Sequence, residues 1–258
     1  MDGLDRKRLF DTLLFVVSFL AICWSVFLLN ETFSLRLNQY GNGPWRVKGL
    51  IGIITSPFLH GDLNHIWGNT LSFFTLGSFL FFFYRKHAFK VLLWLILCSG
   101  VILWLIGVPG SNHIGASGVV YGLASFLFIS GLINDNTVLL RVSMAVAFLY
   151  GSIVWGILPY DPRISWEGHL AGMLVGIALA IAYRGKAPKR QPYQYELDEI
   201  KEAEEAAERE MEIERLKALG LYPPSNENPP QHTGENNISI NYIFEPKKED
   251  KSDNTEDK

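Results

Sequence analysis

Cysteine is scarce in this chain of 258 residues, which contains only Cys23 and Cys98. Both lie within apolar stretches, where free cysteine usually serves as a small packing residue, so a disulfide framework is not expected. The formal net charge is also low, at -3 at pH 7, and no basic patch indicates a nucleic-acid surface. We therefore expect no nucleic-acid partner.

Two common hydrolase motifs are missing as well. No HExxH sequence occurs, which argues against a zinc site built from His60, His65 and His169. A GxSxG nucleophile elbow around Ser117 would need glycine at the position of Val119 and a strand before the serine. We therefore expect neither a metal ion nor an organic cofactor.

Long apolar runs are abundant instead. Stretches of about 17 to 22 residues, long enough to cross a hydrocarbon core of roughly 30 Å, recur through the first 185 residues. A single span in lipid must be helical because its backbone hydrogen bonds have to be satisfied within the segment. We predict an all-α polytopic membrane protein with six transmembrane helices, at residues 10–29, 66–83, 88–107, 117–133, 137–158 and 166–183.

Positive charge predicts the direction of these spans, because lysine and arginine gather on the cytoplasmic side. With six spans, one side carries both termini and these flanking cations: Arg6, Lys7, Arg8, Arg85, Lys86, Lys90, Arg141, Arg184, Lys186, Lys189 and Arg190. The first run exceeds the apolar core of about 7 to 15 residues in a signal peptide, so we expect a retained helix. The expected location is a membrane such as the bacterial inner membrane, with both termini in the cytoplasm.

Two parts of the chain lie outside the six predicted spans. The connection at residues 30–65 contains an apolar stretch at 50–58 that is too short to span, and we expect it on the outer leaflet. The composition becomes polar after the sixth span, so we divide the chain into a membrane domain at residues 1–187 and an acidic cytoplasmic tail at 188–258. The tail is expected to form a solvated helix at about 196–219 and then to be disordered.

Polar side chains gather at one level of the predicted bundle. The second, fourth and sixth spans all run from outside to inside, so their first turns share one membrane depth. His60, His65 and Asn69 lie there at the second span, Ser117 at the fourth and His169 at the sixth. Polar groups inside a membrane are costly, at least ~2.5 kcal/mol for a charged residue at the centre, and therefore indicate functional positions.

Ser117 and His169 are a candidate nucleophile and base. A serine hydroxyl is a weak nucleophile until a base removes its proton, and neutral histidine suits that task near pH 7. The free N–H groups at the start of the fourth span are donors for a developing oxyanion. His65 and Asn69, four residues apart, share a helix face from which either side chain could add a donor.

Small residues would allow the two helices that carry this pair to approach each other. Gly118 and Gly122 have GxxxG spacing on the fourth span, as do Gly168, Gly172 and Gly176 on the sixth. An isolated GxxxG usually serves packing alone. Packing and catalysis are compatible here, because close contact would bring the hydroxyl within reach of the imidazole.

The motifs taken together resemble the rhomboid family of intramembrane proteases. They are GASGVVYG at residues 115–122, HGDLNHIWGN at 60–69, GHLAG at 168–172 and the pair Trp45-Arg46. The resemblance covers residues 10–185 and leaves out the acidic tail.

The resemblance implies a Ser117 nucleophile and a His169 general base, acting as a dyad without an aspartate. His65 and Asn69 would line the oxyanion hole with the backbone N–H of Ser117. The supporting residues would be His60, which braces the first external loop, Tyr121, which packs against the His169 ring, and the motif glycines Gly115, Gly118 and Gly172.

The expected function is that of an intramembrane serine endopeptidase. By the resemblance, its partners would be membrane lipid and single-span transmembrane proteins, whose helix enters between the second and fifth spans and is cut from the external side. One alternative is a catalytically silent, rhomboid-like protein that binds membrane clients, although such a protein would typically lack the serine or the histidine. A small-solute channel is disfavoured because the inner halves of the spans are apolar. The oligomeric state stays open.

Overall fold

The computed structural model describes residues 3–160, 164–186 and 193–221. The chain divides into two compact units, Met1–Gln191 and Pro192–Lys258, which we describe separately. Within the described ranges every regular element is helical, which confirms the all-α prediction.

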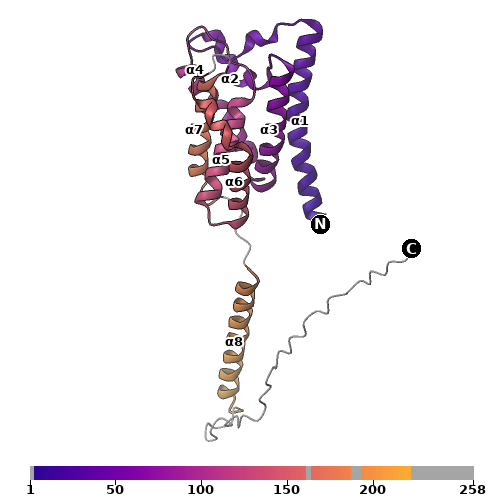
Figure 1. Cartoon of the computed structure of the whole chain (residues 1–258). Coiled ribbons are helices and arrows are strands. Elements are labelled where there is room, and N and C mark those ends of the chain that lie inside the picture. The colour runs from indigo at the N-terminus through magenta and orange to yellow at the C-terminus, as the bar shows by residue number, and fades with distance from the viewer. Residues whose placement is uncertain (1–2, 161–163, 187–192, 222–258) are drawn as a thin grey trace, which may run out of the picture. The chain divides into compact units, whose positions relative to one another are not determined.

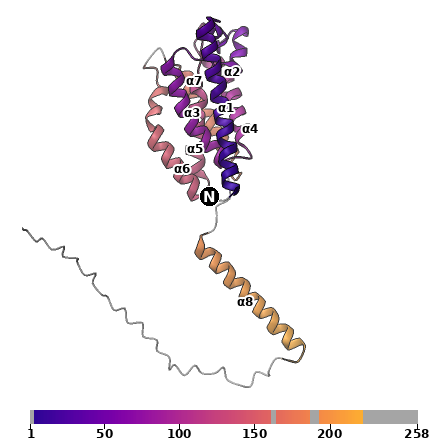
Figure 2. The same ribbon diagram turned by 90° about the vertical axis from the view of Figure 1, so that its right-hand side faces the viewer.

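The first unit is a bundle of long helices that run side by side (Figures 1 and 2). Its helices are α1 (Gly3–Phe33), α2 (Gly52–Thr55), α3 (Leu63–Phe83), α4 (Ala88–Ile106), α5 (Ser117–Ile133), α6 (Thr137–Tyr150) and α7 (Trp166–Ala182). Four 3-10 turns join them: η1 (Leu37–Tyr40), η2 (Val47–Ile51), η3 (Ser56–Phe58) and η4 (Gly151–Ile157).

Helix α5 forms the centre of the bundle. It packs against α3, α4, α6 and α7, and the side chains of Leu123, Phe126 and Leu127 on it are almost fully buried. Phe126 contacts Tyr84, the residue after α3, edge to face at 5.0 Å between ring centroids. Because lipid is as apolar as these side chains, dispersion contacts and close packing stabilise the centre more than transfer from water does.

Glycines bring the backbones of α5 and α7 into contact. A Cβ atom at Gly172 would overlap the carbonyl oxygen of Gly118, and one at Gly176 would overlap that of Gly122. The Ser125 hydroxyl on α5 also donates to the Met173 carbonyl on α7 at 3.0 Å. Residues with side chains at these glycine positions would separate the two helices.

The helices at the predicted spans differ in length. Four helical segments are long and apolar enough to cross a membrane: Arg6–Phe33, Leu63–Phe83, Ala88–Ile106 and Thr137–Ile157. Helices α5 and α7 are apolar but have 17 residues each. At 1.5 Å per residue such a helix is only about 25 Å long, at the lower limit for a span. The count of six spans therefore stays a prediction.

One predicted span has a different internal structure. We expected a continuous helix at residues 137–158, but the α-helix ends at Tyr150 and continues as the 3-10 turn η4. The 3-10 geometry turns backbone carbonyls away from the α-helical pattern. This change brings two backbone carbonyls of η4 to the side chains of Tyr121 and His169.

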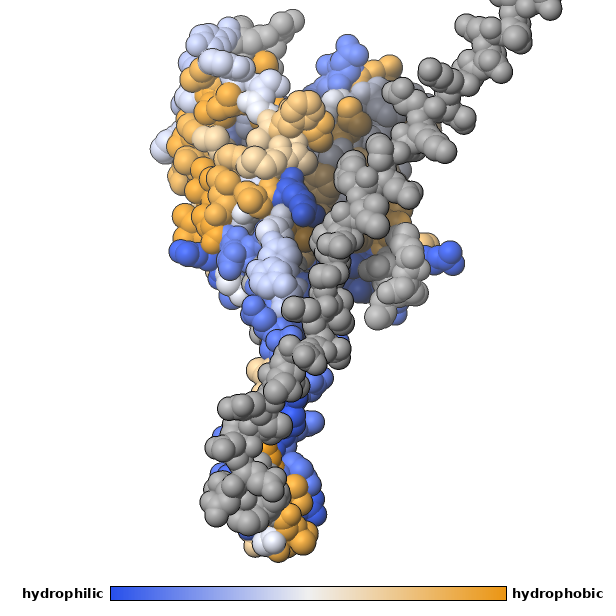
Figure 3. Space-filling model, turned by 60° about the horizontal axis from the view of Figure 1, so that its bottom comes forward, coloured by the Kyte–Doolittle hydropathy of each residue, from blue (hydrophilic) through white to orange (hydrophobic). Residues whose placement is uncertain are grey.

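The surface of the first unit suits a membrane. Apolar residues cover much of the flank in view, and hydrophilic residues lie mainly along its edges (Figure 3). Near the start of α1, the Arg8 guanidinium donates from Nε to the Phe82 carbonyl at 2.7 Å, and Asp11 forms an ion pair with Arg85. These contacts fasten α1 to the end of α3.

The described part of the second unit is one helix, α8 (Gln194–Ala218), near the predicted 196–219. The Glu196 carboxylate accepts a hydrogen bond from the Tyr193 backbone N–H at 2.9 Å and so caps the first turn. The segment predicted to be disordered lies outside the described residues. The domain boundary at 187 and 188 stays a prediction.

Candidate active site

Ser117 is the first residue of α5, and the connection between α1 and α3 holds the loop before it. His113 and Asn42 exchange backbone hydrogen bonds of 2.8 Å, and the Gly115 N–H donates to the Ser56 carbonyl at 2.9 Å. Gly115 has a φ of +106°, which side chains rarely allow. These bonds fix the turn before α5 and therefore the position of the Ser117 hydroxyl at the start of the helix.

His169 lies in the first turn of α7 and faces Ser117. Its Nε2 atom is 2.9 Å from the Ser117 Oγ atom. Its Nδ1 atom is 2.9 Å from the carbonyl oxygen of Gly156 in η4. A carbonyl only accepts hydrogen bonds, so Nδ1 carries the proton and Nε2 is free to accept from the hydroxyl. The two predicted residues are therefore brought together in a geometry suited to proton transfer.

The Tyr121 ring packs against one face of the His169 imidazole. The two rings stack with centroids 4.0 Å apart and 9° between the planes. The Tyr121 hydroxyl donates to the carbonyl of Ile153 at 2.7 Å. Tyr121 follows Ser117 by four residues, so both lie on one face of α5.

His65 and Asn69 lie on α3 beside the Ser117 loop. A Cβ atom at Gly115 would overlap the His65 ring at Nε2 and lie 3.3 Å from the Asn69 Nδ2 atom. The Asn69 side chain is buried, and within the described residues its Nδ2 donor has no hydrogen-bond partner. A buried donor without a partner is costly, so this group is available to an acceptor that arrives with a substrate.

His60 lies in the loop before α3 and is almost fully buried. Its ring contacts the His65 ring edge to face at 5.0 Å between centroids, and its carbonyl accepts from Asn38 in η1 at 3.3 Å. Burial, and then the proximity of His65, lower the His60 pKa to about 4. The residue is therefore a neutral packing group between α3 and the connection that precedes it.

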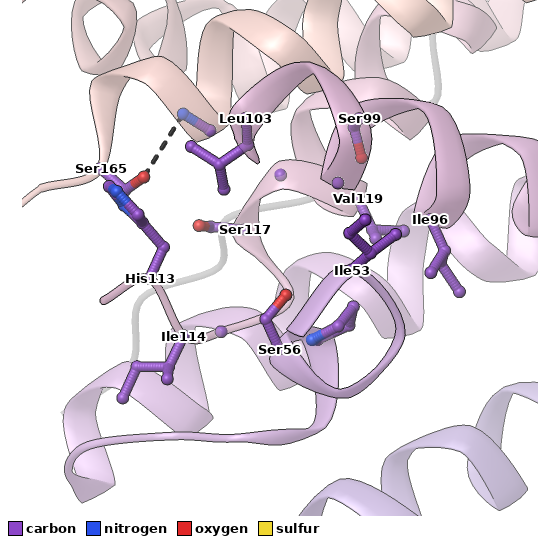
Figure 4. A pocket seen from close by; sticks show the side chains of 15 residues that line it. Ile53, Ser56, Ile96, Ser99, Leu103, His113, Ile114, Ser117, Val119 and Ser165 are labelled. Carbon is purple, nitrogen blue, oxygen red and sulfur yellow. Dashed lines mark hydrogen bonds between the residues drawn. The ribbon is translucent and has the colours of Figure 1, made fainter. Parts of the chain in front are cut away.

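A pocket opens beside the Ser117 hydroxyl (Figure 4). Its wall combines the connection between α1 and α3, helix α4, the loop before α5 and the starts of α5 and α7. The labelled side chains are Ile53, Ser56, Ile96, Ser99, Leu103, His113, Ile114, Ser117, Val119 and Ser165. His113 pairs there with the Ser111 hydroxyl at 2.7 Å, and burial lowers its pKa.

The sequence did not reveal two of the groups that contact Tyr121 and His169. They are the carbonyls of Ile153 and Gly156, which have no side-chain signature. Ser165, which caps α7 by accepting from the Gly168 N–H at 3.3 Å, was also missed, although serine before an apolar helix is a recognisable cap. Among the described residues, no three His, Cys, Asp or Glu side chains are grouped closely enough to hold a metal ion.

Several known proteins are similar to this chain in sequence. The family model for the rhomboid domain matches residues 45–186. An uncharacterized protein of Mycobacterium tuberculosis is 33% identical over 187 residues, covering 68% of this chain and 76% of the relative. One from Mycobacterium leprae is 29% identical over 184 residues, covering 68% and 72%. A protein of Acanthamoeba polyphaga mimivirus whose name includes rhomboid is 28% identical over 139 residues, covering 52% and 75%. The chain belongs to the rhomboid family.

Proposed function

We propose that this protein is a serine endopeptidase that hydrolyses peptide bonds in or near transmembrane segments of other membrane proteins. The observation that carries the proposal is the 2.9 Å contact between Ser117 Oγ and the unprotonated Nε2 of His169. Membership of the rhomboid family supports the same reaction class.

In the first half of the reaction, the Ser117 oxygen attacks the carbonyl carbon of the scissile bond. His169 Nε2 takes the hydroxyl proton, and the carbonyl oxygen becomes an oxyanion. When the tetrahedral intermediate collapses, the C–N bond breaks and His169 gives its proton to the leaving amine. The remaining acyl group is then an ester on Ser117.

In the second half, water attacks the ester. His169 removes a proton from the water molecule, a second tetrahedral intermediate forms, and the proton returns to Ser117 as the new carboxyl product leaves. Each half-reaction needs one base and one proton carrier, and the same imidazole serves as both.

The oxyanion would be bound by donors from two helices. The backbone N–H groups at the start of α5 have no intrahelical acceptor. The Asn69 amide, with its unpaired Nδ2, and the His65 ring face the same turn. Loss of one such donor typically slows a hydrolase by about 10²- to 10³-fold.

We also propose the topology that this reaction requires. Six spans would put both termini in the cytoplasm and the dyad near the external surface, where water is available for the second half-reaction. The substrates would be single-span membrane proteins. The apolar flank of the first unit supports contact with lipid and with such helices.

The test is cleavage of a model single-span substrate by the purified full-length protein in detergent. Ser117→Ala and His169→Ala are expected to abolish cleavage, whereas Ser18→Ala, on the exposed face of α1, should cleave like the wild type. A fluorophosphonate should label wild type at Ser117. If Ser117→Ala cuts as fast as wild type, the nucleophile assignment is wrong. If wild type binds the substrate but neither cuts it nor reacts with the fluorophosphonate, the protein is a client-binding member of the family.

A further inference from the structure

The 3-10 turn η4, which follows α6, contacts both His169 and the Tyr121 ring on which it stacks. The Ile153 carbonyl accepts a hydrogen bond from the Tyr121 hydroxyl, and the Gly156 carbonyl accepts one from His169 Nδ1. In a 3-10 helix, residues three apart lie on the same side. The change from α-helix to 3-10 turn therefore aims two acceptors at the stacked Tyr121 and His169 rings.

Gly156 also provides the space in which the two rings stack. A Cβ atom at this position would overlap the Tyr121 hydroxyl oxygen and lie 3.2 Å from His169 Nδ1. By contrast, a Cβ atom at Gly151, five residues earlier in the same turn, would meet nothing within 4 Å. The surroundings therefore require glycine at position 156 but not at position 151.

We infer that Gly156 is the positioning residue of the dyad: its carbonyl fixes the tautomer of His169, and its missing side chain admits the Tyr121–His169 stack. The inference rests on the proposed function. A serine triad usually assigns the tautomer with a carboxylate, and the wrong tautomer leaves no acceptor for the serine proton.

Glu167 is the acidic residue closest to His169 in the chain and is buried, so it must be considered for this role. It precedes His169 by two residues on α7, and residues two apart on a helix do not face each other. The hydrogen bond at Nδ1 goes to the Gly156 carbonyl on another element. A neutral acceptor orients the ring without adding a second buried charge to the site.

The consequence for catalysis is specific. Without the Gly156 acceptor at its present position, the imidazole can carry its proton on Nε2, and that form cannot deprotonate Ser117. The imidazole acts as a base in the chemical step, whereas ground-state binding of the substrate does not depend on its protonation at Nε2. The variant Gly156→Ala should therefore lower kcat, by about 10²- to 10³-fold for loss of an oriented general base, with little change in KM.

The experiment compares Gly156→Ala with the matched control Gly151→Ala in the full-length protein. We measure kcat, KM and the rate of Ser117 labelling by a fluorophosphonate, together with the thermal midpoint of each variant. Gly151→Ala should behave as wild type. If Gly156→Ala labels and cleaves at the wild-type rate, the inference is wrong.

A spectroscopic measurement keeps the inference testable if Gly156→Ala folds poorly. Nitrogen-15 NMR of histidine-labelled wild type, with His169 identified by difference from His169→Ala, should show a protonated Nδ1 and a bare Nε2 at neutral pH. Folded Gly156→Ala should show a mixture of tautomers. A protonated Nε2 in the wild type would overturn the inference. If wild type shows the expected tautomer but cleaves nothing, the proposed function fails while the role of Gly156 in orienting the ring stands.

Discussion

The phenol ring of Tyr121 lies nearly parallel to the imidazole of His169, with 4.0 Å between the ring centroids. Tyr121 is on the same face of α5 as Ser117, one turn further along. The helix that begins with the candidate nucleophile therefore also carries the surface on which the candidate base rests, and a shift of α5 would move both together.

Substitution of Tyr121 should separate the ring contact from the hydroxyl contact. Tyr121→Phe keeps the stack and loses only the bond to the Ile153 carbonyl, which is worth about 1 kcal/mol. It should lower kcat/KM by about tenfold or less. Tyr121→Ala also removes a buried ring and should destabilise the protein by roughly 3–5 kcal/mol. Thermal unfolding in detergent and kcat/KM measure the two effects. Equal damage by both variants would show that the hydroxyl, not the ring, positions His169.

Removal of the Asn69 amide should slow the chemical step. Asn69→Ala should lower kcat by about 10²-fold with a smaller change in KM, because the oxyanion forms only in the transition state. The neighbouring variant Gly68→Ala is the control, since a Cβ atom at Gly68 meets nothing within 4 Å. Steady-state kinetics on the model substrate give kcat and KM for both variants. An unchanged kcat in Asn69→Ala would remove this residue from the oxyanion hole.

The contact between α5 and α7 should not tolerate a methyl group. Gly172→Ala places a Cβ atom against the Gly118 carbonyl, and overpacking of this kind typically costs about 1–3 kcal/mol. Gly68→Ala, also within a helix but facing open space, should be neutral or stabilising by up to about 1 kcal/mol. The thermal midpoint of Gly172→Ala should therefore fall, whereas that of Gly68→Ala should stay unchanged or rise. A stabilised Gly172→Ala would contradict the packing described for these helices.

Acid should destabilise the protein in part through His60. Its pKa is about 4 in the folded protein, below the usual 6.5. Between these values the unfolded chain binds the additional proton, so the free energy of unfolding should fall as pH decreases from 6.5 to 4, by up to roughly 3 kcal/mol. His60→Gln cannot take up this proton. Unfolding of wild type and His60→Gln at pH 7 and pH 4.5 should show a weaker pH dependence in the variant, and parallel curves would rule out His60 as the cause.

Most of the helical structure could be predicted from apolar runs and their boundaries. The fourth predicted segment, 117–133, coincides with α5, and the third, 88–107, differs from α4 by one residue. The family resemblance, read from motifs around Ser117, His65 and His169, is confirmed by the match at residues 45–186. The number of spans was harder to predict, because α5 and α7 have only 17 residues each.

The candidate site was predicted only at the level of side chains. Ser117, His169, His65, Asn69 and Tyr121 carry polar or aromatic groups in unusual places, so sequence indicates them. Their roles stay predictions until activity is measured. The two η4 carbonyls could not be predicted, because every residue has a carbonyl and only its direction gives it a role.

The sequence by itself determined which segments are helical and which side chains are chemically competent, since apolar runs and rare polar groups are properties of the chain. The tertiary structure decided which of those groups meet. It ended the α6 helix at Tyr150, turned the Gly156 carbonyl toward His169, and brought α5 against α7 through their glycines. These outcomes depend on distances between segments far apart in the chain, and backbone hydrogen bonds of that kind leave no pattern in the residues that form them.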